Sequence, residues 1–287
     1  MIDIIPVGLL QGLLLSIVAI GVMIPFRLLN FPDLTAEGSY PLGGVLTASL
    51  ILADVNPFVA TILGCCAGGM MGLCTAFVHI RFKINTLLAG IILSIMIYSV
   101  NLRIMGKPNL ALFEEFTLFS NMSESLFLKI GLLLIFNGIL LSLMYGFLMT
   151  EKGLRLRAVG LNGEFSERNG IKTSLYIFLG LFFGNALCAL AGSLMVQNQN
   201  YADIGMGIGI VIHALAALLI GESVLGTHTL RRQLFAPLIG AIIYQQIQGL
   251  ALSLGLSPSD LKFVTGGIVL LIMGFSKNRM SRKGVFG

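Results

Sequence analysis

The sequence predicts an all-α, polytopic membrane protein, and two observations carry that prediction. Of its 287 residues, 56% are hydrophobic and only 11% are charged, whereas a soluble domain carries about 25% charged residues. Apolar runs of about 20 residues, the length that crosses a bilayer as a helix, recur along the whole chain. No soluble fold can bury this much apolar surface. We therefore expect a single transmembrane domain over residues 1–287.

The apolar runs give about nine predicted spans. Seven runs are long enough to cross a bilayer, at residues 7–29, 57–80, 84–105, 126–149, 173–195, 205–225 and 233–254. Two shorter runs, 41–54 and 261–276, complete the set. A polar stretch marked by Pro and Gly precedes the first of these, so we expect a broken helix near residues 30–54. The first run is longer than the apolar core of a signal peptide and has no basic residues before it, so we expect a mature helix.

The distribution of Lys and Arg predicts the orientation of the chain. With alternating spans and a cytoplasmic C-terminus, the predicted inner side collects Arg27, Arg81, Lys83, Lys152, Arg155, Arg157, Arg168, Lys172, Arg231, Arg232, Lys277, Arg279, Arg282 and Lys283. The outer side keeps Arg103, Lys107, Lys129 and Lys262. The N-terminus is then outside, and residues 277–287 form a basic cytoplasmic tail. Because the net charge of +5 sits in these short loops, it gives no reason to expect a nucleic-acid partner.

Two sequence echoes predict an inverted repeat. The motif Asn30-Phe-Pro-Asp33-Leu recurs as Asn200-Tyr-Ala-Asp203-Ile, and Lys83-Ile-Asn-Thr86 recurs as Lys262-Phe-Val-Thr265. The predicted topology puts the first copy of each motif inside and the second outside, as in many transporters. We expect a first repeat over 7–105, a linking helix at 126–149 and a second repeat over 173–276.

The broken stretch after the first span is the candidate substrate path. Irregular backbone at membrane depth must be buried in protein or line a cavity, because lipid cannot satisfy its amides. Thr35 or Ser39 can cap a half-helix whose amide end attracts a carboxylate, and Glu37 or Asp33 can meet a cation. The alternative is a capped turn at the interface, with Asp33 facing water. The predicted path residues are Asn30, Thr35, Glu37, Ser39, Asn200, Asp203 and His213. For His213, simple helix packing is the competing interpretation.

Other polar and cysteine residues within the spans favour structural roles. Asn101, Asn137, Asn185, Gln245, Gln246 and Gln248 are expected to form interhelix hydrogen bonds. Glu222 is expected to form an ion pair with nearby Arg231 or Arg232. The cysteines at 65, 66, 74 and 188 are expected to be core side chains, since their spacing fits neither a disulfide framework nor a zinc site. Residues 106–125 are either an amphipathic interfacial segment or a solvated loop.

The loop at residues 150–172 has the most specific pattern. Asn162 is a good N-cap, Glu164 falls in the first helical turn, and Asn169-Gly170 favours a helix end. The pattern predicts a helix of about two turns that displays Phe165. Such a short helix is unstable alone in water, so we expect a partner protein to cover it.

This loop resembles the coupling-helix region of ATP-binding cassette (ABC) permeases of the branched-chain amino acid and ribose class. The resemblance is carried by Gly153, Arg157, Ala158, Gly160, Asn162, Gly170 and Ile171, and by Ala189-Leu-Ala-Gly192 in the next span. The segment Asn30-Phe-Pro-Asp-Leu-Thr-Ala-Glu-Gly38 looks most like a branch associated with lipoprotein-type binding proteins and aromatic amino acid import.

The resemblance implies a bacterial inner-membrane importer subunit that works as a homodimer within the lipid bilayer. An ATPase subunit would dock at Arg157, Gly160, Asn162, Glu164, Phe165, Glu167, Arg168 and Gly170, and a binding protein or lipoprotein would deliver a small polar solute outside. The sequence has no phosphate-binding loop, so ATP use is assigned to the partner. No catalytic residue, metal site or bound cofactor is expected in this chain.

An ion-gradient-driven secondary transporter is the competing prediction. An inverted repeat, a broken helix and a buried Glu37 suit such a transporter equally well. The capped loop around Phe165 is the feature that favours the ABC permease. A membrane-embedded enzyme is disfavoured because the predicted spans lack clustered histidines or paired acids.

Overall fold

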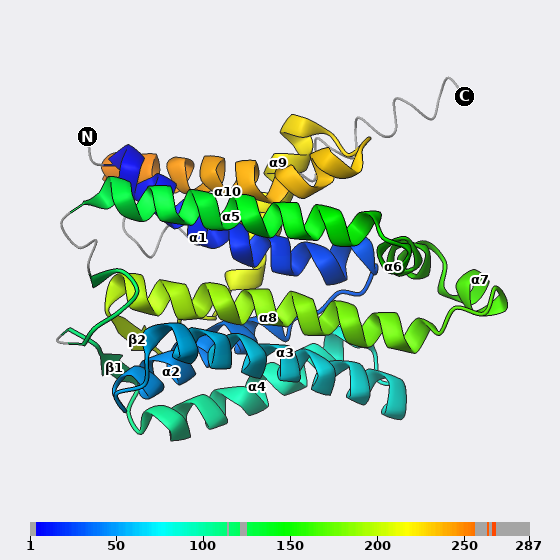
Figure 1. Ribbon diagram of the computed structural model, residues 1–287, viewed down its shortest axis with the longest axis horizontal. Coiled ribbons are helices and arrows are strands. Elements are labelled where there is room, and N and C mark those ends of the chain that lie inside the picture. The colour runs from blue at the N-terminus through cyan, green and yellow to red at the C-terminus, as the bar shows by residue number, and fades with distance from the viewer. Residues whose placement is uncertain (1–3, 114, 121–124, 256–262, 264–265, 268–287) are drawn as a thin grey trace.

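The computed structural model describes residues 4–113, 115–120, 125–255, 263, 266 and 267, and it is almost entirely helical (Figure 1). The elements are α1 (Ile4–Met23), the π-helical turn η1 (Ile24–Leu28), α2 (Ala36–Ile51), α3 (Pro57–Phe82), α4 (Thr86–Met105), β1 (Asn109–Ala111), α5 (Leu126–Met149), α6 (Glu151–Leu161), α7 (Gly163–Arg168), α8 (Thr173–Gln199), β2 (Tyr201–Asp203), α9 (Ile210–Leu225) and α10 (Leu230–Ser253).

Six helices in the described part of the chain are long and apolar enough to cross a membrane. They are Ile5–Leu28, Pro57–Phe82, Thr86–Met105, Leu126–Met149, Thr173–Gln199 and Leu230–Ser253. The predicted number of about nine is not confirmed, since α2 and α9 have only 16 residues each. The predicted span at 261–276 and the tail at 277–287 lie outside the described residues, apart from 263, 266 and 267. The Lys262–Thr265 motif lies there too.

The two short helices differ in how well the sequence predicted them. α2 covers Ala36–Ile51, which agrees with a broken helix that starts near Leu34, and Pro41 sits inside the helix without ending it. α9 begins at Ile210 rather than at 205, because the Gly-rich segment before it forms turns and Gly209 has a φ of 81°. Both helices are therefore too short to cross a bilayer of about 30 Å alone.

The long helices alternate in direction and give the bundle two distinct ends (Figure 1). One end carries α6 and α7, and we call it the α6–α7 end. The other carries the antiparallel pair of β1 and β2, in which Leu110 lies opposite Ala202, and we call it the hairpin end. The N-terminus of α1 lies at the hairpin end, opposite α6 and α7.

The strand β1 corrects the interpretation of residues 106–125. This segment was expected to be an amphipathic interfacial stretch or a solvated loop, yet Leu110 and Leu112 are buried in a cluster with Ala202 and Ile204. The backbone N–H of Leu112 also donates to the Asn200 carbonyl over 2.8 Å. The segment therefore packs on the second half of the chain, at Asn200, Ala202 and Ile204, and its own sequence did not predict these contacts.

Small residues let the helices cross closely. α8 packs along α3 and α2, while α1 packs along α10 and α9. At the crossings a Cβ on Gly43 would overlap the Ala189 carbonyl of α8, and one on Gly240 would overlap the Ala217 carbonyl of α9. The long helix that leads into each short helix thus packs on the other short helix and on the long helix that follows that other one: α1 packs on α9 and α10, and α8 packs on α2 and α3. An inverted repeat would produce this reciprocal pattern, and the repeat itself stays a prediction.

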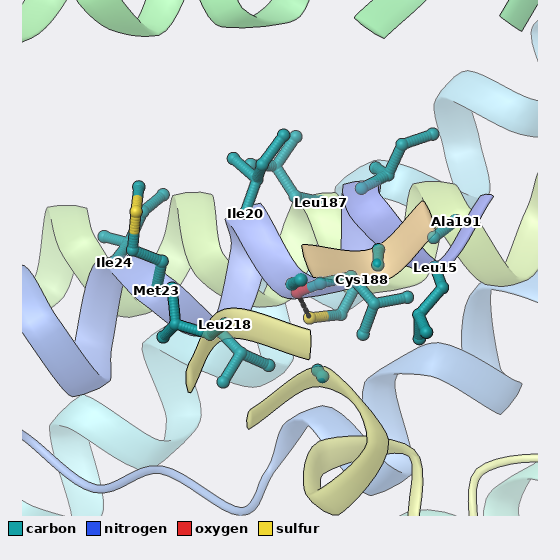
Figure 2. Close-up of a cluster of buried hydrophobic side chains, with 14 of the residues drawn as sticks. Leu15, Ile20, Met23, Ile24, Leu187, Cys188, Ala191 and Leu218 are labelled. Carbon is teal, nitrogen blue, oxygen red and sulfur yellow. Dashed lines mark hydrogen bonds between the residues drawn. The ribbon is translucent and has the colours of Figure 1, made fainter. Parts of the chain in front are cut away.

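The hydrophobic core lies between α1, α8 and α9 (Figure 2). Leu15, Ile20 and Met23 of α1 face Leu187 and Cys188 of α8 and Leu218 of α9. The Cys188 thiol points at the Val18 carbonyl, 3.9 Å away. Of the four cysteines predicted to be core residues, only Cys188 is buried; Cys65 is half-buried, and Cys66 and Cys74 are exposed.

The outward faces of α3, α4 and α5 are apolar. Phe58, Ile95 and Leu143 are among the many large hydrophobic side chains exposed there. Water would make such surfaces costly, whereas lipid tails are as apolar as the side chains themselves. This pattern agrees with a multi-pass membrane protein.

Candidate functional site

The chain leaves α1 through η1 and then turns back into the bundle. Asn30 adopts the left-handed conformation with a φ of 52°, which Asn tolerates better than most residues. The Asp33 Oδ1 atom then accepts a hydrogen bond from the Thr35 backbone N–H over 2.9 Å, and α2 begins. Thr35 and Ser39 were predicted as caps of this half-helix. Neither caps it with its side chain, because Asp33 accepts from the first free amide instead.

Asp33 is the centre of a buried polar network. It is 1% exposed, and its Oδ2 accepts from Asn185 Nδ2 over 2.7 Å. Ser39 donates to Asn185 Oδ1 over 2.8 Å, while the Thr35 and Thr75 hydroxyls share a hydrogen bond of 2.6 Å. The interpretation of Asp33 as facing water is therefore wrong. Its partner Asn185 lies 152 residues away, so only the packing of α8 against this turn could bring the two together.

The second copy of the motif forms a similar turn at the hairpin end. Asn200 has a φ of 59°, and Asp203 Oδ1 accepts from the Gly205 backbone N–H over 2.7 Å. Here the aspartate belongs to β2 and is only half-buried. The two motifs thus share local geometry while their surroundings differ.

The short helices α2 and α9 meet with their N-termini together. The Glu37 carboxylate, in the first turn of α2, accepts a hydrogen bond from the backbone N–H of Gly209, the N-cap residue of α9. Beside it, a Cβ on Gly207 would overlap the Glu37 carbonyl oxygen. The amide end of a helix carries a partial positive charge, so a carboxylate is well placed there. Glu37 is half-buried, so part of its side chain remains exposed.

Of the predicted path residues, Glu37 lies at this junction and His213 lies in the first turn of α9, one turn beyond Gly209. The His213 backbone N–H donates to the Gly209 carbonyl over 3.1 Å. Its ring lies 5.7 Å from the Tyr244 ring of α10, as a packing histidine would. Thr35 and Ser39 are buried in the network around Asp33. Asn30 follows η1, which contacts α6 at Gly160, whereas Asn200 caps α8 next to β2 and Asp203 belongs to β2 at the hairpin end.

The other intramembrane polar residues have mixed outcomes. Asn137 of α5 donates to the Leu13 carbonyl of α1 over 3.2 Å and accepts from Ser16 over 2.7 Å, which confirms the predicted interhelix bonds. Asn185 of α8 likewise forms an interhelix bond, since it accepts from Ser39 of α2. Asn101 is buried, and within the described part of the chain its amide has no hydrogen-bond partner.

Glu222 forms its ion pair with a different arginine from the predicted ones. It pairs with Arg27 of η1, because α9 returns beside the end of α1. Arg231 instead donates to the Tyr145 hydroxyl over 3.2 Å. The prediction of Arg231 or Arg232 as partner is thus wrong, since closeness in sequence did not decide which charges meet.

The loop at 150–172 contains the predicted capped helix. Asn162 Oδ1 accepts from the Phe165 backbone N–H over 2.9 Å and starts α7, and Gly170, with a φ of 77°, follows its end. The Phe165 side chain is 65% exposed, as predicted. Four predicted docking side chains are exposed on α7, namely Glu164, Phe165, Glu167 and Arg168.

The same loop also contains α6, which the sequence did not predict, and it is not isolated from the rest of the chain. A Cβ on Gly160 would overlap the Leu28 carbonyl of η1. Arg157 Nη2 donates to the Leu148 carbonyl over 3.3 Å, and Thr173 of α8 donates to Glu167. A hydrogen bond with Tyr176, supported by Glu151, raises the pKa of the Arg155 guanidinium. Arg157 and Gly160 therefore hold the loop on the bundle, while α7 stays exposed.

Comparison with known families identifies the chain. Residues 4–274 match the family described as branched-chain amino acid transport system, permease component. This chain belongs to that permease family. It is the membrane permease of an ABC importer for a small solute, a transport subunit rather than an enzyme, and such systems include an ATPase and a substrate-binding partner.

Several relatives of this permease are similar over almost its whole length. A tyrosine transport system permease protein of Clostridioides difficile is 38% identical over 95% of this chain and 91% of its own. An uncharacterised protein of Rickettsia prowazekii is 35% identical over 91% and 93%, respectively. An L-arabinose ABC transporter permease protein of Azospirillum brasilense is 27% identical over 96% and 81%. No solved structure matches the chain.

Proposed function

We propose that this permease imports an amino acid, and that an aromatic amino acid such as tyrosine is its substrate. The observation that carries the proposal is the 38% identity to a tyrosine transport permease over 95% of the chain. The more distant arabinose permease, at 27% identity, gives weaker support for a sugar. Family membership also favours the ABC importer over an ion-gradient-driven transporter.

The junction of α2 and α9 suits a zwitterionic substrate. Its carboxylate takes the Gly209 N–H that Glu37 holds in this structure, at the positive end of α9. Glu37 then turns toward the ammonium group. The carboxylate and the ammonium group of the substrate thus each meet a group of opposite charge at this junction. A neutral sugar has no such charges. A charged group at membrane depth is costly unless it faces protein or water, which favours a role for Glu37 in the path.

The substrate proposal is tested by uptake into proteoliposomes. The permease is reconstituted with its partner ATPase and binding protein, and radiolabelled tyrosine is supplied with and without internal ATP. We expect ATP-dependent tyrosine uptake that phenylalanine and tryptophan inhibit and arabinose does not. Uptake of arabinose in place of tyrosine would contradict the substrate, and uptake driven by a proton or sodium gradient without ATP would contradict the mechanism.

We also propose that α7 docks the ATPase subunit, which hydrolyses the ATP. The support is a capped six-residue helix that exposes Phe165, an apolar group that solvent alone would not favour. Phe165→Ala should reduce ATPase co-purification and uptake together. Leu154→Ala is the matched control, because Leu154 is a similarly exposed apolar residue on neighbouring α6. ATPase retention at the wild-type level in Phe165→Ala would place docking elsewhere.

The proposed assembly is a homodimer in the bilayer with the α6–α7 end inside the cell. ABC transporters operate two ATPases together, and each chain offers one docking helix, so two copies are needed. The basic residues gathered around α6 and α7 favour a cytoplasmic location for that end, which puts the N-terminus and the hairpin end outside, where the binding protein arrives. Mass measurement of the active complex in detergent tests the dimer, and one permease chain per complex would contradict it.

A further inference from the structure

The coupling loop at residues 150–172 contacts the bundle at α5, α8 and η1, and the contact with η1 is the one that leads to both short helices. The backbone of Gly160 in α6 lies directly on the Leu28 carbonyl and beside the Leu29 Cα, so closely that a Cβ would overlap the carbonyl oxygen. No flexible side chain separates the two backbones. Packed protein transmits displacement instead of absorbing it, so a shift of α6 moves the end of η1.

The segment η1 is joined to both short helices. Toward α2 it continues through the Asn30 turn, where Asp33 accepts the hydrogen bond from Thr35 at the start of that helix. Toward α9 the Arg27 guanidinium of η1 pairs with Glu222, in the last turns of that helix. The Glu222 side chain is 14% exposed and the Arg27 side chain 47%, so the pair is shielded from solvent on the glutamate side.

The geometry points to η1 as the element that passes movement of the ATPase-docking loop to the junction of α2 and α9. In this arrangement Gly160 and the Arg27–Glu222 pair are positioning residues: they touch no substrate and act through the two short helices that hold Glu37 and Gly209. The inference rests on the proposed docking of the ATPase at α7. It goes beyond that proposal by naming the contact through which docking reaches the substrate path.

The first test adds one methyl group at the contact. Gly160→Ala should leave ATPase binding and ATP hydrolysis in place while uptake per ATP hydrolysed falls about two- to thirtyfold, the range of coupling changes that such contacts produce. Gly146→Ala is the matched control. Gly146 is an exposed residue of α5 at the same end of the bundle, and no described atom would lie within 4 Å of the added Cβ. Wild-type uptake per ATP in Gly160→Ala would overturn the inference.

A charge exchange keeps the inference testable if Gly160→Ala does not fold. Arg27→Glu and Glu222→Arg should each lower uptake per ATP with the ATPase still bound, and the double exchange R27E/E222R should restore it. Normal coupling in both single variants, or no recovery in the double exchange, would overturn the inference. A purely structural pair would instead change the amount of folded complex and leave uptake per ATP unchanged.

Failure of this inference differs from failure of the docking proposal. If Phe165→Ala keeps the ATPase bound, docking at α7 is wrong. If Phe165→Ala releases the ATPase while Gly160→Ala and the charge variants leave coupling normal, docking stands and transmission through η1 is wrong.

Discussion

The Asn30–Asp33 turn and the Asn200–Asp203 turn are nearly the same locally and very different in their surroundings. In each, a left-handed asparagine ends a helix, and three residues later an aspartate accepts from the amide two positions on. Asp33 is then buried and bound by Asn185, whereas Asp203 is half-buried in β2 at the hairpin end.

The difference shows that the shared motif of Asn followed three residues later by Asp determines the shape of the turn. The helices and strands packed around the turn determine what it does in the structure. Asn and Asp favour such turns through their own side chains, whatever surrounds them. The first copy, placed between α3 and α8, becomes a junction that holds α2 in the bundle. The second copy pairs instead with β1 and leads the chain toward α9. The two segments also meet: Glu37 lies four residues after Asp33, Gly207 lies four residues after Asp203, and Glu37 and Gly207 contact each other.

The largest expected difference is between Asp33→Ala and Asp203→Ala. The first leaves the Thr35 amide and the Asn185 side chain without their acceptor in a buried site, at a cost of about 1–3 kcal/mol for each group. The second removes one acceptor from a half-exposed turn, at about 1 kcal/mol. Thermal unfolding of both variants in detergent measures the difference. Equal losses would mean that burial does not distinguish the two turns.

Glu37→Gln should have an intermediate effect that appears in transport rather than in stability. The amide keeps the shape and can still accept from Gly209, but it no longer offers a charge to a substrate ammonium group. We expect uptake to fall about tenfold, which corresponds to about 1.4 kcal/mol, with normal assembly and ATPase binding. Glu115→Gln, in the segment that follows β1, is the control. Normal uptake in Glu37→Gln, or loss of folded protein, would assign Glu37 a structural role or none.

The smallest expected effect is the same for both turns. Asn30→Ala and Asn200→Ala each force a residue with a Cβ and no hydrogen-bonding side chain into the left-handed region, at about 1 kcal/mol. Asn→Gly at either site should be close to neutral, because Gly adopts this conformation freely. Melting temperatures of the four variants test this. A large difference between the two alanine variants would show that the turns are not locally equivalent.

Local patterns predicted the parts of the site that depend on neighbouring residues. Asn162 caps α7 and Gly170 follows its end because each acts within one or two helical turns. The helix α6 was missed because its Gly153 and Gly160 read as loop residues. In the structure, both glycines allow close contact with other parts of the chain, at Leu148 and Leu28 respectively.

By itself the sequence determined that this chain is a helical membrane protein, where its long helices run and that a capped helix displays Phe165, since composition, apolar length and capping are local properties. Only the tertiary structure decided that Asp33 is buried on Asn185, that Glu222 pairs with Arg27 and that Glu37 meets Gly209. In each of these pairs the partners are more than 100 residues apart. The physical reason is that helix packing, which depends on the shapes of whole helices, chooses which polar groups meet inside the membrane.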